Sequence, residues 1–239
     1  PLVVPEVNPQ AILKHKGIIA NPNCSTIIMV MALKPIYDLA KIKRVIVSTY
    51  QAVSGAGKEG IDELDAQVRD HSEGREMTAN ILPSASAEKH YPIAFNLIPQ
   101  IDVFCDNLYT KEEMKMVNET KKIMEDYEMR ITATTIRVPV YRSHSESVNI
   151  ELEKEVDLGA MREALAKFPG VTVQDDPSKQ EYPMPLYTSE KDDVYVGRLR
   201  RDESCEKSYN MWVVGDQIRK GAALNTLQIA ETMIKNGWI

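Results

Sequence analysis

The feature that most constrains the fold is an Asn-Pro-Asn-Cys-Ser-Thr sequence at residues 21–26, followed by an apolar run at 27–33. The two asparagines and the proline supply turn and helix-capping chemistry. The apolar run predicts a helix that begins at or beside Cys24 and is buried on more than one side. The apolar residues 17–20 before the turn predict a short buried strand. A strand, a tight turn and a helix that begins near a thiol therefore organise the chain.

Two interpretations of Cys24 follow from this turn and helix. A thiol at a helix N-terminus faces unpaired backbone N–H groups and the positive end of the helix dipole, and both lower the pKa of a cysteine. The other interpretation is that Cys24 is a small buried hydrophobic residue. The turn and helix do not decide between these interpretations.

Composition excludes several classes of protein. The chain has 239 residues and a net charge of −6, which argues against a nucleic-acid partner and against an anionic membrane surface. No apolar run is long enough to span a membrane, and no basic and apolar signal opens the chain. The three cysteines lie far apart, which disfavours a zinc site or a disulfide framework and suits the reducing cytoplasm.

The length allows one large domain or two small ones. The chain opens at Pro1 without an initiator methionine, and we expect it to be the middle of a longer protein.

A glycine-rich stretch follows a β-branched strand predicted at residues 44–50. Gly55, Gly57 and Gly60 match the G-x-G-x-x-G pattern and precede a predicted helix at 61–69. No second strand with an acidic end follows at the distance that a dinucleotide-binding unit requires. We therefore interpret the glycines as a turn that brings the backbone close to a ligand, and not as a pyrophosphate loop.

The remaining pattern predicts an α+β domain in which helices cover a mixed sheet. Pro35 should end or kink the first helix. Thr110 and Glu113 form a capping box at the start of another helix. The other predicted elements are a helix ending near 126, strands at 130–140, 148–152 and 171–173, a helix at 157–168, a hairpin of 194–201 with 209–214, and a helix at 220–237.

Six side chains are candidates for chemistry, namely Cys24, Gln51, Glu112, Lys115, Arg137 and His144. A thiol at a helix start and a histidine elsewhere fit covalent catalysis on an acyl group. A carboxylate and an arginine can hold an amino group and a carboxylate, and a lysine can hold a phosphate. Two alternatives stay open, because His144 fits an exposed loop equally well and Glu112 and Lys115 fit a solvated i,i+3 pair.

Five stretches together resemble the aspartate-β-semialdehyde dehydrogenase family, and they occur in the order of that family. The resemblance covers essentially the whole chain. The stretches are 21–26, 48–57, 90–96, 137–140 with 143–146, and 220–225.

The resemblance implies a reaction and a role for each candidate. The family uses NADPH to reduce β-aspartyl phosphate to aspartate semialdehyde, in the biosynthesis of lysine (through diaminopimelate), threonine and methionine. Cys24 resembles the nucleophile that forms a thioester, His144 the general acid/base, and Gln51 the residue that orients the acyl intermediate. The implied substrate contacts are Glu112 to the α-amino group, Arg137 to the α-carboxylate, Lys115 to the phosphate, and Asn23.

The resemblance also implies the cofactor, fold and assembly. Ser54, Gly55 and Gly57 would lie beside the nicotinamide of NADP, and Asn225 would contact it. The implied fold is the catalytic domain of the glyceraldehyde-3-phosphate dehydrogenase type, with a remnant of a Rossmann domain. The implied assembly is a homodimer. The expected domains are the end of a dinucleotide-binding domain (1–23), a catalytic and dimerisation domain (24–218), and a C-terminal helix that packs on the dinucleotide-binding domain (219–239).

Two further expectations accompany the resemblance. The N-terminal Rossmann segment of the family is absent from this sequence, so we expect the chain alone to bind NADPH poorly and to have little activity. The competing functions are another cysteine and histidine acyl-phosphate reductase, such as N-acetyl-glutamyl-phosphate reductase or glyceraldehyde-3-phosphate dehydrogenase, and a non-catalytic dimerisation module. Glu112 with Arg137 favours aspartyl phosphate, because an acetylated amine needs no carboxylate partner.

Overall fold

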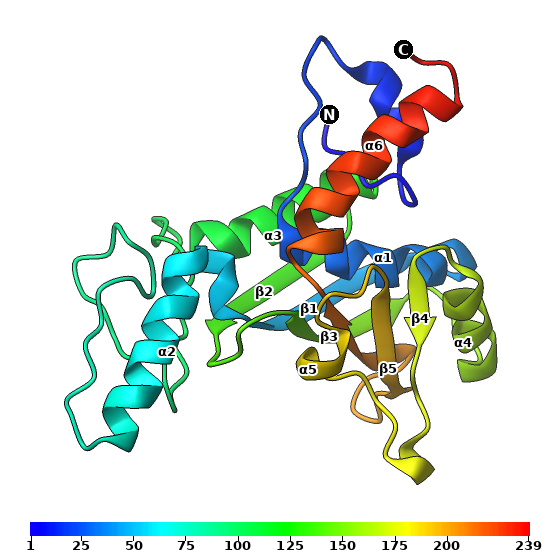
Figure 1. The fold of residues 1–239 in the computed structure, drawn as a ribbon. Helices are drawn as coiled ribbons and strands as arrows, with labels where there is room; N and C mark the ends of the chain where they lie inside the picture. Colours follow the sequence, from blue (N-terminus) through cyan, green and yellow to red (C-terminus); the bar gives the residue numbers. More distant parts are fainter.

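A six-stranded mixed sheet forms the centre of the molecule in the computed structural model, which describes all 239 residues (Figure 1). The strands lie in the order β2-β1-β3-β6-β5-β4. Two neighbouring pairs, β1 with β2 and β4 with β5, are parallel, and the other pairs are antiparallel. The prediction of an α+β fold with a mixed sheet is confirmed. The strands are β1 Ile42–Gln51, β2 Arg130–Arg137, β3 His144–Leu152, β4 Val171–Val173, β5 Val194–Arg201 and β6 Ser208–Gly215.

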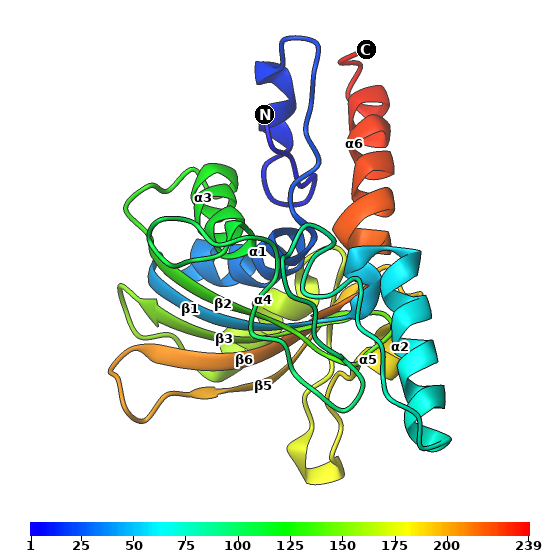
Figure 2. The same cartoon turned by 90° about the vertical axis from the view of Figure 1, so that its left-hand side faces the viewer.

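Three helices, α1, α3 and α4, cover one face of the sheet (Figures 1 and 2). They and the facing strand residues form a core cluster of 30 buried hydrophobic residues, and α1 supplies eight of them in the run 27–33 with Ile36. None of the helices is long and apolar enough to cross a membrane. The helices are α1 Cys24–Leu39, α2 Lys58–Ser72, α3 Lys111–Ile123, α4 Leu158–Lys167, α5 Pro185–Thr188 and α6 Leu224–Lys235, and short helical turns lie at Pro9–Lys14, Val53–Ala56, Pro177–Lys179 and Arg219–Ala223.

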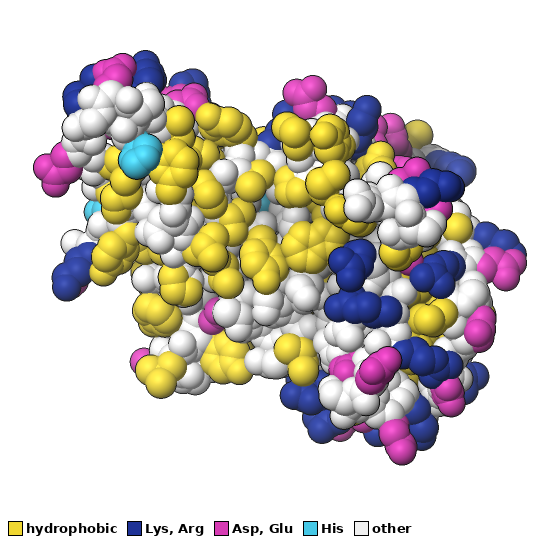
Figure 3. Space-filling view, turned by 90° about the horizontal axis from the view of Figure 1, so that it is seen from below, with side chains coloured by type: hydrophobic (Ala, Val, Ile, Leu, Met, Phe, Trp, Pro, Cys, Tyr) yellow, Lys and Arg dark blue, Asp and Glu magenta, His cyan; other side chains and the backbone are white.

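The other face of the sheet carries no helix layer. Ile46, Tyr50 and Trp212 point to this face and are only half-buried. The rings of Tyr50 and Trp212 lie across the sheet from one another with centroids 5.5 Å apart. Hydrophobic side chains gather over this side of the molecule (Figure 3). A partly exposed apolar face of this kind is typical of a protein–protein interface.

Pro35 does not end α1, which continues to Leu39. Of the two outcomes that the sequence predicts at Pro35, an end or a kink, the end does not occur. A proline in a helix interior removes one backbone hydrogen bond and costs about 3 kcal/mol. Ile36, directly after it, is fully buried in the main core. The burial of α1 on the sheet outweighs the local cost.

The predicted buried strand at residues 17–20 is also wrong. The segment makes only an isolated parallel bridge between Leu2 and Ala20, and Ile18 is 80% exposed. No element of the chain packs over this apolar residue.

The first 20 residues instead lie beside α6, above the layer of helices (Figure 1). A small core cluster of Val3, Ala11, Ile12 and Ile229 joins the two segments. The buried ammonium group of Lys220 also donates to Glu6, at 2.6 Å between Nζ and Oε2. The two ends of the chain therefore stabilise one another.

Candidate active site

The candidate nucleophile Cys24 is the first residue of α1, as the sequence predicts. The Asn23 side chain caps the helix, because its Oδ1 accepts from the backbone N–H of Thr26 at 3.1 Å. Two carboxylates of α3 hold this cap from the side. Glu112 Oε1 accepts from Asn23 Nδ2 at 2.9 Å, and Glu119 Oε2 accepts from the Asn23 backbone N–H at 2.7 Å. The turn before the thiol is thus fixed by a second helix.

His144 lies against this thiol, with its Nε2 3.5 Å from Cys24 Sγ. The sequence placed His144 in a loop, but it is the first residue of β3 and is fully buried. Two neighbours explain its burial. It pairs with Gly215 of β6, and the turn at Gly55 packs so closely that an added Cβ there would lie 3.3 Å from His144 Cε1. The exposed-loop alternative is therefore wrong.

The charge states of this pair differ from the prediction made from the helix N-terminus. Burial, and then the neighbouring Glu112 carboxylate, raise the pKa of the Cys24 thiol to about 12. Burial, and then the positive charge of Arg137, hold the pKa of His144 well below its usual range. Both groups are therefore neutral near pH 7 in the ligand-free chain. The prediction of a lowered cysteine pKa is wrong for this state.

Glu112 and Arg137 flank the pair as two buried charges of opposite sign. Glu112 Oε1 accepts from Gln51 Nε2 at 3.2 Å, in addition to its bond with Asn23. Arg137 donates from NH1 to the Ala52 carbonyl at 2.7 Å, while its buried Nε has no partner. A buried guanidinium nitrogen without a partner is costly, and an anion can satisfy it.

Lys115 lies at the exposed rim of this cluster. Its Nζ is 3.6 Å from Glu112 Oε2 and 3.4 Å from Asp102 Oδ2. Burial lowers the pKa of Lys115, but the carboxylates of Glu112 and Asp102 outweigh it and leave the pKa above its usual range. The predicted i,i+3 pair of Glu112 and Lys115 exists, but Glu112 is only 6% exposed and is not a solvated surface residue.

The glycine turn after β1 lies beside the same site. Gly55 is exposed, and a Cβ there would come within 2.6 Å of Arg137 NH1. Gly57 has a φ of 85° and open space around it. A Cβ on Gly60 would strike the Val53 carbonyl at 2.4 Å, so this glycine is needed for packing. The turn thus leaves exposed backbone at Gly55 beside His144 and Arg137.

Two of the predicted cofactor contacts use their side chains within the chain. Ser54 Oγ accepts from Gln217 Nε2. Asn225 is fully buried, and its Nδ2 donates to the Val3 carbonyl at 2.9 Å and to Asn21 Oδ1 at 2.8 Å. Asn225 therefore holds the N-terminal segment and is not brought to the Cys24 cluster.

The sequence did not point to three groups that the fold adds to this region. They are the backbone of Ala52, the Glu119 carboxylate, and Glu146, which is two residues after His144 and on the same face of β3. Glu119 is seven residues after Glu112 on α3, so the helical period was an available signal. Backbone contacts such as those of Ala52 leave no signal in the residue types.

Glu146 gives a prediction for stability. It is fully buried, neither carboxylate oxygen has a partner, and burial raises its pKa well above the usual range. The folded state therefore binds the proton more tightly than the unfolded state. The free energy of unfolding should fall as pH rises above about 4.3, by up to about 1.4 kcal/mol per pH unit, until the folded pKa is reached.

We expect Glu146→Gln to remove this loss, so that the variant gains stability over the parent at pH 8 relative to pH 5. Denaturant unfolding at both pH values measures the difference. Glu151→Gln is the matched control on the same strand, because Glu151 pairs with Lys43 and Arg130 at the surface. An equal pH dependence in the parent and in Glu146→Gln would contradict the expectation.

Comparison with known proteins connects this cluster to one family. A family profile described as "Semialdehyde dehydrogenase, dimerisation domain" matches residues 33–220. The aspartate-semialdehyde dehydrogenase of Aquifex aeolicus is 55% identical over 241 residues, covering 100% of this chain and 69% of the relative. That of Bacillus subtilis is 52% identical and covers 98% and 68%.

Solved structures give the same result. Aspartate semialdehyde dehydrogenase II from Vibrio cholerae, complexed with ASA, has a TM-score of 0.91 and 47% identity, and the match covers 98% of this chain and 68% of that one. Aspartate semialdehyde dehydrogenase with NADP from Candida albicans has a TM-score of 0.72 and 24% identity, covering 100% and 68%. The second likeness shows the shared fold.

Proposed function

Because the chain belongs to the aspartate-semialdehyde dehydrogenase family, we propose that Cys24 is the nucleophile that takes the β-aspartyl group from β-aspartyl phosphate as a thioester. The observation that carries the proposal is the Cys24–His144 contact at 3.5 Å, at a helix start between the buried charges of Glu112 and Arg137. Reduction of the thioester, with the hydride that bound NADPH would supply, would give aspartate semialdehyde, an oxidoreductase step in the biosynthesis of lysine, threonine and methionine. The free thiols suit an enzyme of the cytoplasm.

The charges of the cluster match the three polar ends of this substrate. Arg137, with its unpartnered Nε, would hold the α-carboxylate. Glu112 would hold the α-ammonium group, and Lys115, at the exposed rim, would hold the phosphate. Gln51, which is fixed by Glu112, would orient the acyl group, and His144 would be the acid/base partner of Cys24. Asn23, whose Nδ2 donates to Glu112, would be a further substrate-binding residue.

The reaction has two stages at the thiol. The Cys24 sulfur attacks the acyl carbon, a C–S bond forms and the C–O bond to phosphate breaks. NADP in its reduced form, when bound, supplies a hydride to the thioester carbon. The C–S bond of the resulting thiohemiacetal then breaks, which releases the aldehyde and leaves the sulfur on Cys24. The charge that appears on the carbonyl oxygen lies beside His144, where a donor stabilises it.

The open backbone at Gly55 and Gly57 would lie beside the nicotinamide end of the cofactor, and Ser54 would hold that turn through its bond with Gln217. Asn225 would act there only through the N-terminal segment that it holds. We propose the domain division stated from the sequence, with residues 24–218 as the catalytic and dimerisation domain. The segments 1–23 and 219–239 would then belong with a dinucleotide-binding domain, which is consistent with their mutual contacts above the sheet.

We expect residues 1–239 on their own to bind NADPH weakly, with a Kd above about 1 mM, the upper end of the usual range for enzyme substrates. The reason is that the one glycine match in the chain serves packing and an open turn and not a phosphate loop. A fluorescence titration with NADPH measures the affinity. Saturation in the micromolar range would contradict the expectation.

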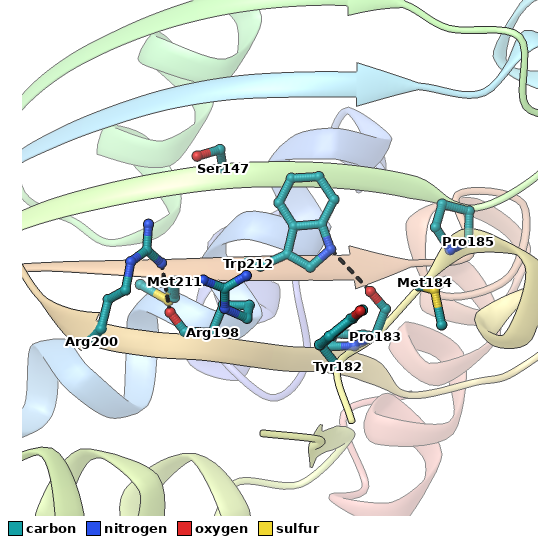
Figure 4. A pocket seen from close by; sticks show the side chains of 9 residues that line it. All are labelled: Ser147, Tyr182, Pro183, Met184, Pro185, Arg198, Arg200, Met211 and Trp212. Carbon is teal, nitrogen blue, oxygen red and sulfur yellow. Dashed lines mark hydrogen bonds between the residues drawn. The ribbon is translucent and has the colours of Figure 1, made fainter. Parts of the chain in front are cut away.

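We propose that a second copy of the chain covers the open face of the sheet. The face carries a hollow between the 182–185 segment and the β5–β6 hairpin (Figure 4). Trp212 anchors one wall, because its Nε1 donates to the Pro183 carbonyl at 3.0 Å. The hollow is lined by Ser147, Tyr182, Pro183, Met184, Pro185, Arg198, Arg200, Met211 and Trp212. Apolar and aromatic side chains with arginines are the composition of an interface.

The dimer gives a third prediction. We expect Ile46→Lys to convert the dimer into a monomer, because the substitution buries an unpaired charge in the interface. Sedimentation equilibrium measures the mass. Glu163→Lys, on the exposed side of α4, is the matched control and should remain dimeric. A dimer that survives Ile46→Lys with unchanged affinity would place the interface elsewhere.

The substrate assignment is tested against the nearest competing activity. The protein is mixed with β-aspartyl phosphate or with N-acetyl-γ-glutamyl phosphate, without NADPH, and phosphate release is followed. We expect release from β-aspartyl phosphate, because Glu112 needs a cationic partner. Faster release from the acetylated compound would overturn the assignment.

A further inference from the structure

The backbone N–H of Ala52 points at the imidazole ring of His144. It lies 3.0 Å from Nδ1, measured between the nitrogen atoms, and meets that atom as a hydrogen-bond donor. A backbone N–H has no acceptor capacity. Nδ1 must therefore present its lone pair to Ala52 and cannot itself carry a proton while this bond exists.

In the neutral ring, Nε2 must then be the nitrogen that carries the proton. If Nδ1 is the acceptor, the single proton of a neutral imidazole lies on Nε2. Nε2 is the atom that lies 3.5 Å from Cys24 Sγ. We propose that the Ala52 N–H fixes His144 as the Nε2–H tautomer, so that His144 faces Cys24 as a hydrogen-bond donor and does not accept the thiol proton.

The surroundings keep this arrangement rigid. Ala52 is fully buried, and its carbonyl accepts from Arg137 NH1 at 2.7 Å and from the Gly55 N–H at 3.1 Å. His144 is also fully buried, and Gly55 lies against its Cε1 edge. Turning the ring over about its Cβ–Cγ bond would put Cδ2 in the place of Nδ1 and leave the buried Ala52 N–H without an acceptor. The positive charge of Arg137 beside it opposes a second proton on the ring.

This inference rests on the proposed function and narrows the role of His144 there, from an acid/base partner of Cys24 to a hydrogen-bond donor. A neutral imidazole N–H can stabilise a developing anion without giving up its proton. A Cys24 thiolate attacks the acyl phosphate and expels phosphate, which takes up the one proton that the overall reaction consumes. After hydride arrival the negative charge is on the carbonyl oxygen, and when the C–S bond breaks it returns to sulfur. Nε2–H can donate to oxygen and sulfur in turn throughout this cycle.

If His144 does not accept the thiol proton, another group must favour the thiolate form of Cys24. Burial disfavours the Cys24 thiolate most, and the carboxylate of Glu112 adds to this effect. The α-ammonium group of the substrate would neutralise that carboxylate, and the thiol proton would leave to solvent. Binding of the substrate thus favours the attacking form of the thiol.

Nuclear magnetic resonance of the protein with ¹⁵N-labelled histidine tests the tautomer directly. The chain has four histidines, and the signals lost in His144→Gln assign residue 144. We expect an unprotonated Nδ1 and a protonated Nε2 that do not titrate between about pH 5.5 and pH 8.5, a range that brackets the usual pKa of histidine. Of the titratable groups near the ring, Arg137 and Cys24 should keep their charge states in this range, and repeating the titration in Glu146→Gln separates any effect of the raised pKa of Glu146. A protonated Nδ1 would overturn the inference.

A single-atom change tests the cause. Lactate in place of Ala52 replaces the amide before this residue by an ester, so that an ester oxygen stands where the N–H was and every side chain is kept. We expect this variant to populate the Nδ1–H tautomer. The matched control is the corresponding ester at Val53, whose N–H donates to the Val140 carbonyl at 2.8 Å and not to His144. An unchanged tautomer in the Ala52 ester, or an equal change in the Val53 ester, would overturn the proposal.

A rate measurement distinguishes hydrogen-bond donation by His144 from transfer of the thiol proton to His144. Glutamine can donate a hydrogen bond but cannot act as a base near pH 7. We expect His144→Gln to release phosphate from β-aspartyl phosphate at least tenfold faster than His144→Ala. Equal loss in both variants would show that His144 accepts the thiol proton. Failure of the parent to release phosphate would contradict the proposed function and leave the tautomer result standing.

Discussion

Replacement of Cys24 by serine is expected to lower the rate of phosphate release from β-aspartyl phosphate by at least about 10³-fold, because a serine hydroxyl is a far weaker nucleophile than a thiolate at neutral pH. Serine is smaller than cysteine and keeps the first position of α1. The Asn23 cap and the contacts of α1 with the sheet should remain, so the variant should fold normally.

Stopped-flow measurement of phosphate release, with circular dichroism as the test of folding, examines this expectation. Cys105→Ser and Cys205→Ser are the controls, because these free cysteines lie outside the cluster of His144, Glu112 and Arg137. Both controls should retain the parent rate. A Cys24→Ser variant within tenfold of the parent would exclude Cys24 as the nucleophile.

Glu112→Gln is expected to change two properties in opposite directions. The carboxylate raises the pKa of the Cys24 thiol, so its loss should lower that pKa and speed the alkylation of Cys24 by iodoacetamide at pH 8. The same change removes the proposed partner of the substrate ammonium group. A lost charge-assisted hydrogen bond of about 1.5–3 kcal/mol corresponds to a roughly 10- to 100-fold increase in KM.

Glutamine keeps an oxygen at the position that accepts from Asn23 and Gln51, so the turn before the thiol should survive. Glu113→Gln is the matched control on the same helix. Glu113 accepts from the Thr110 and Thr135 N–H groups at 2.7 and 3.0 Å, so this control should lose stability without faster alkylation of Cys24. Slower or unchanged alkylation in Glu112→Gln would contradict the account of the thiol.

Local patterns predicted the parts of the fold that depend on neighbouring residues. The capping box of Thr110 and Glu113, the Asn23 cap and the β5–β6 hairpin are all present where the sequence indicated them. Each of them depends on turn or capping chemistry within a few residues. The α+β class followed from the same elements, because a mixed set of strands and helices has few ways to bury its apolar faces.

Features that depend on distant parts of the chain were not predictable in this way. The polar residues around His144 indicated a loop, but β6 and the Gly55 turn bury that residue. The helix start at Cys24 indicated a lowered pKa, but burial and Glu112, which is 88 positions away on α3, reverse the sign. Pro35 indicated an end or a kink, and the core contacts of α1 carry the helix past it to Leu39. In each case a contact across the sheet or between helices decided the outcome.

The central proposal is that the β-aspartyl group becomes attached to Cys24. Mass spectrometry of the protein after incubation with β-aspartyl phosphate, in the absence of NADPH, tests it most directly because this step needs no cofactor. The account predicts one β-aspartyl group per chain, located on the peptide that contains Cys24 and removed by hydroxylamine as a thioester would be. Phosphate release without such an adduct, or an adduct at Cys105 or Cys205, would contradict it.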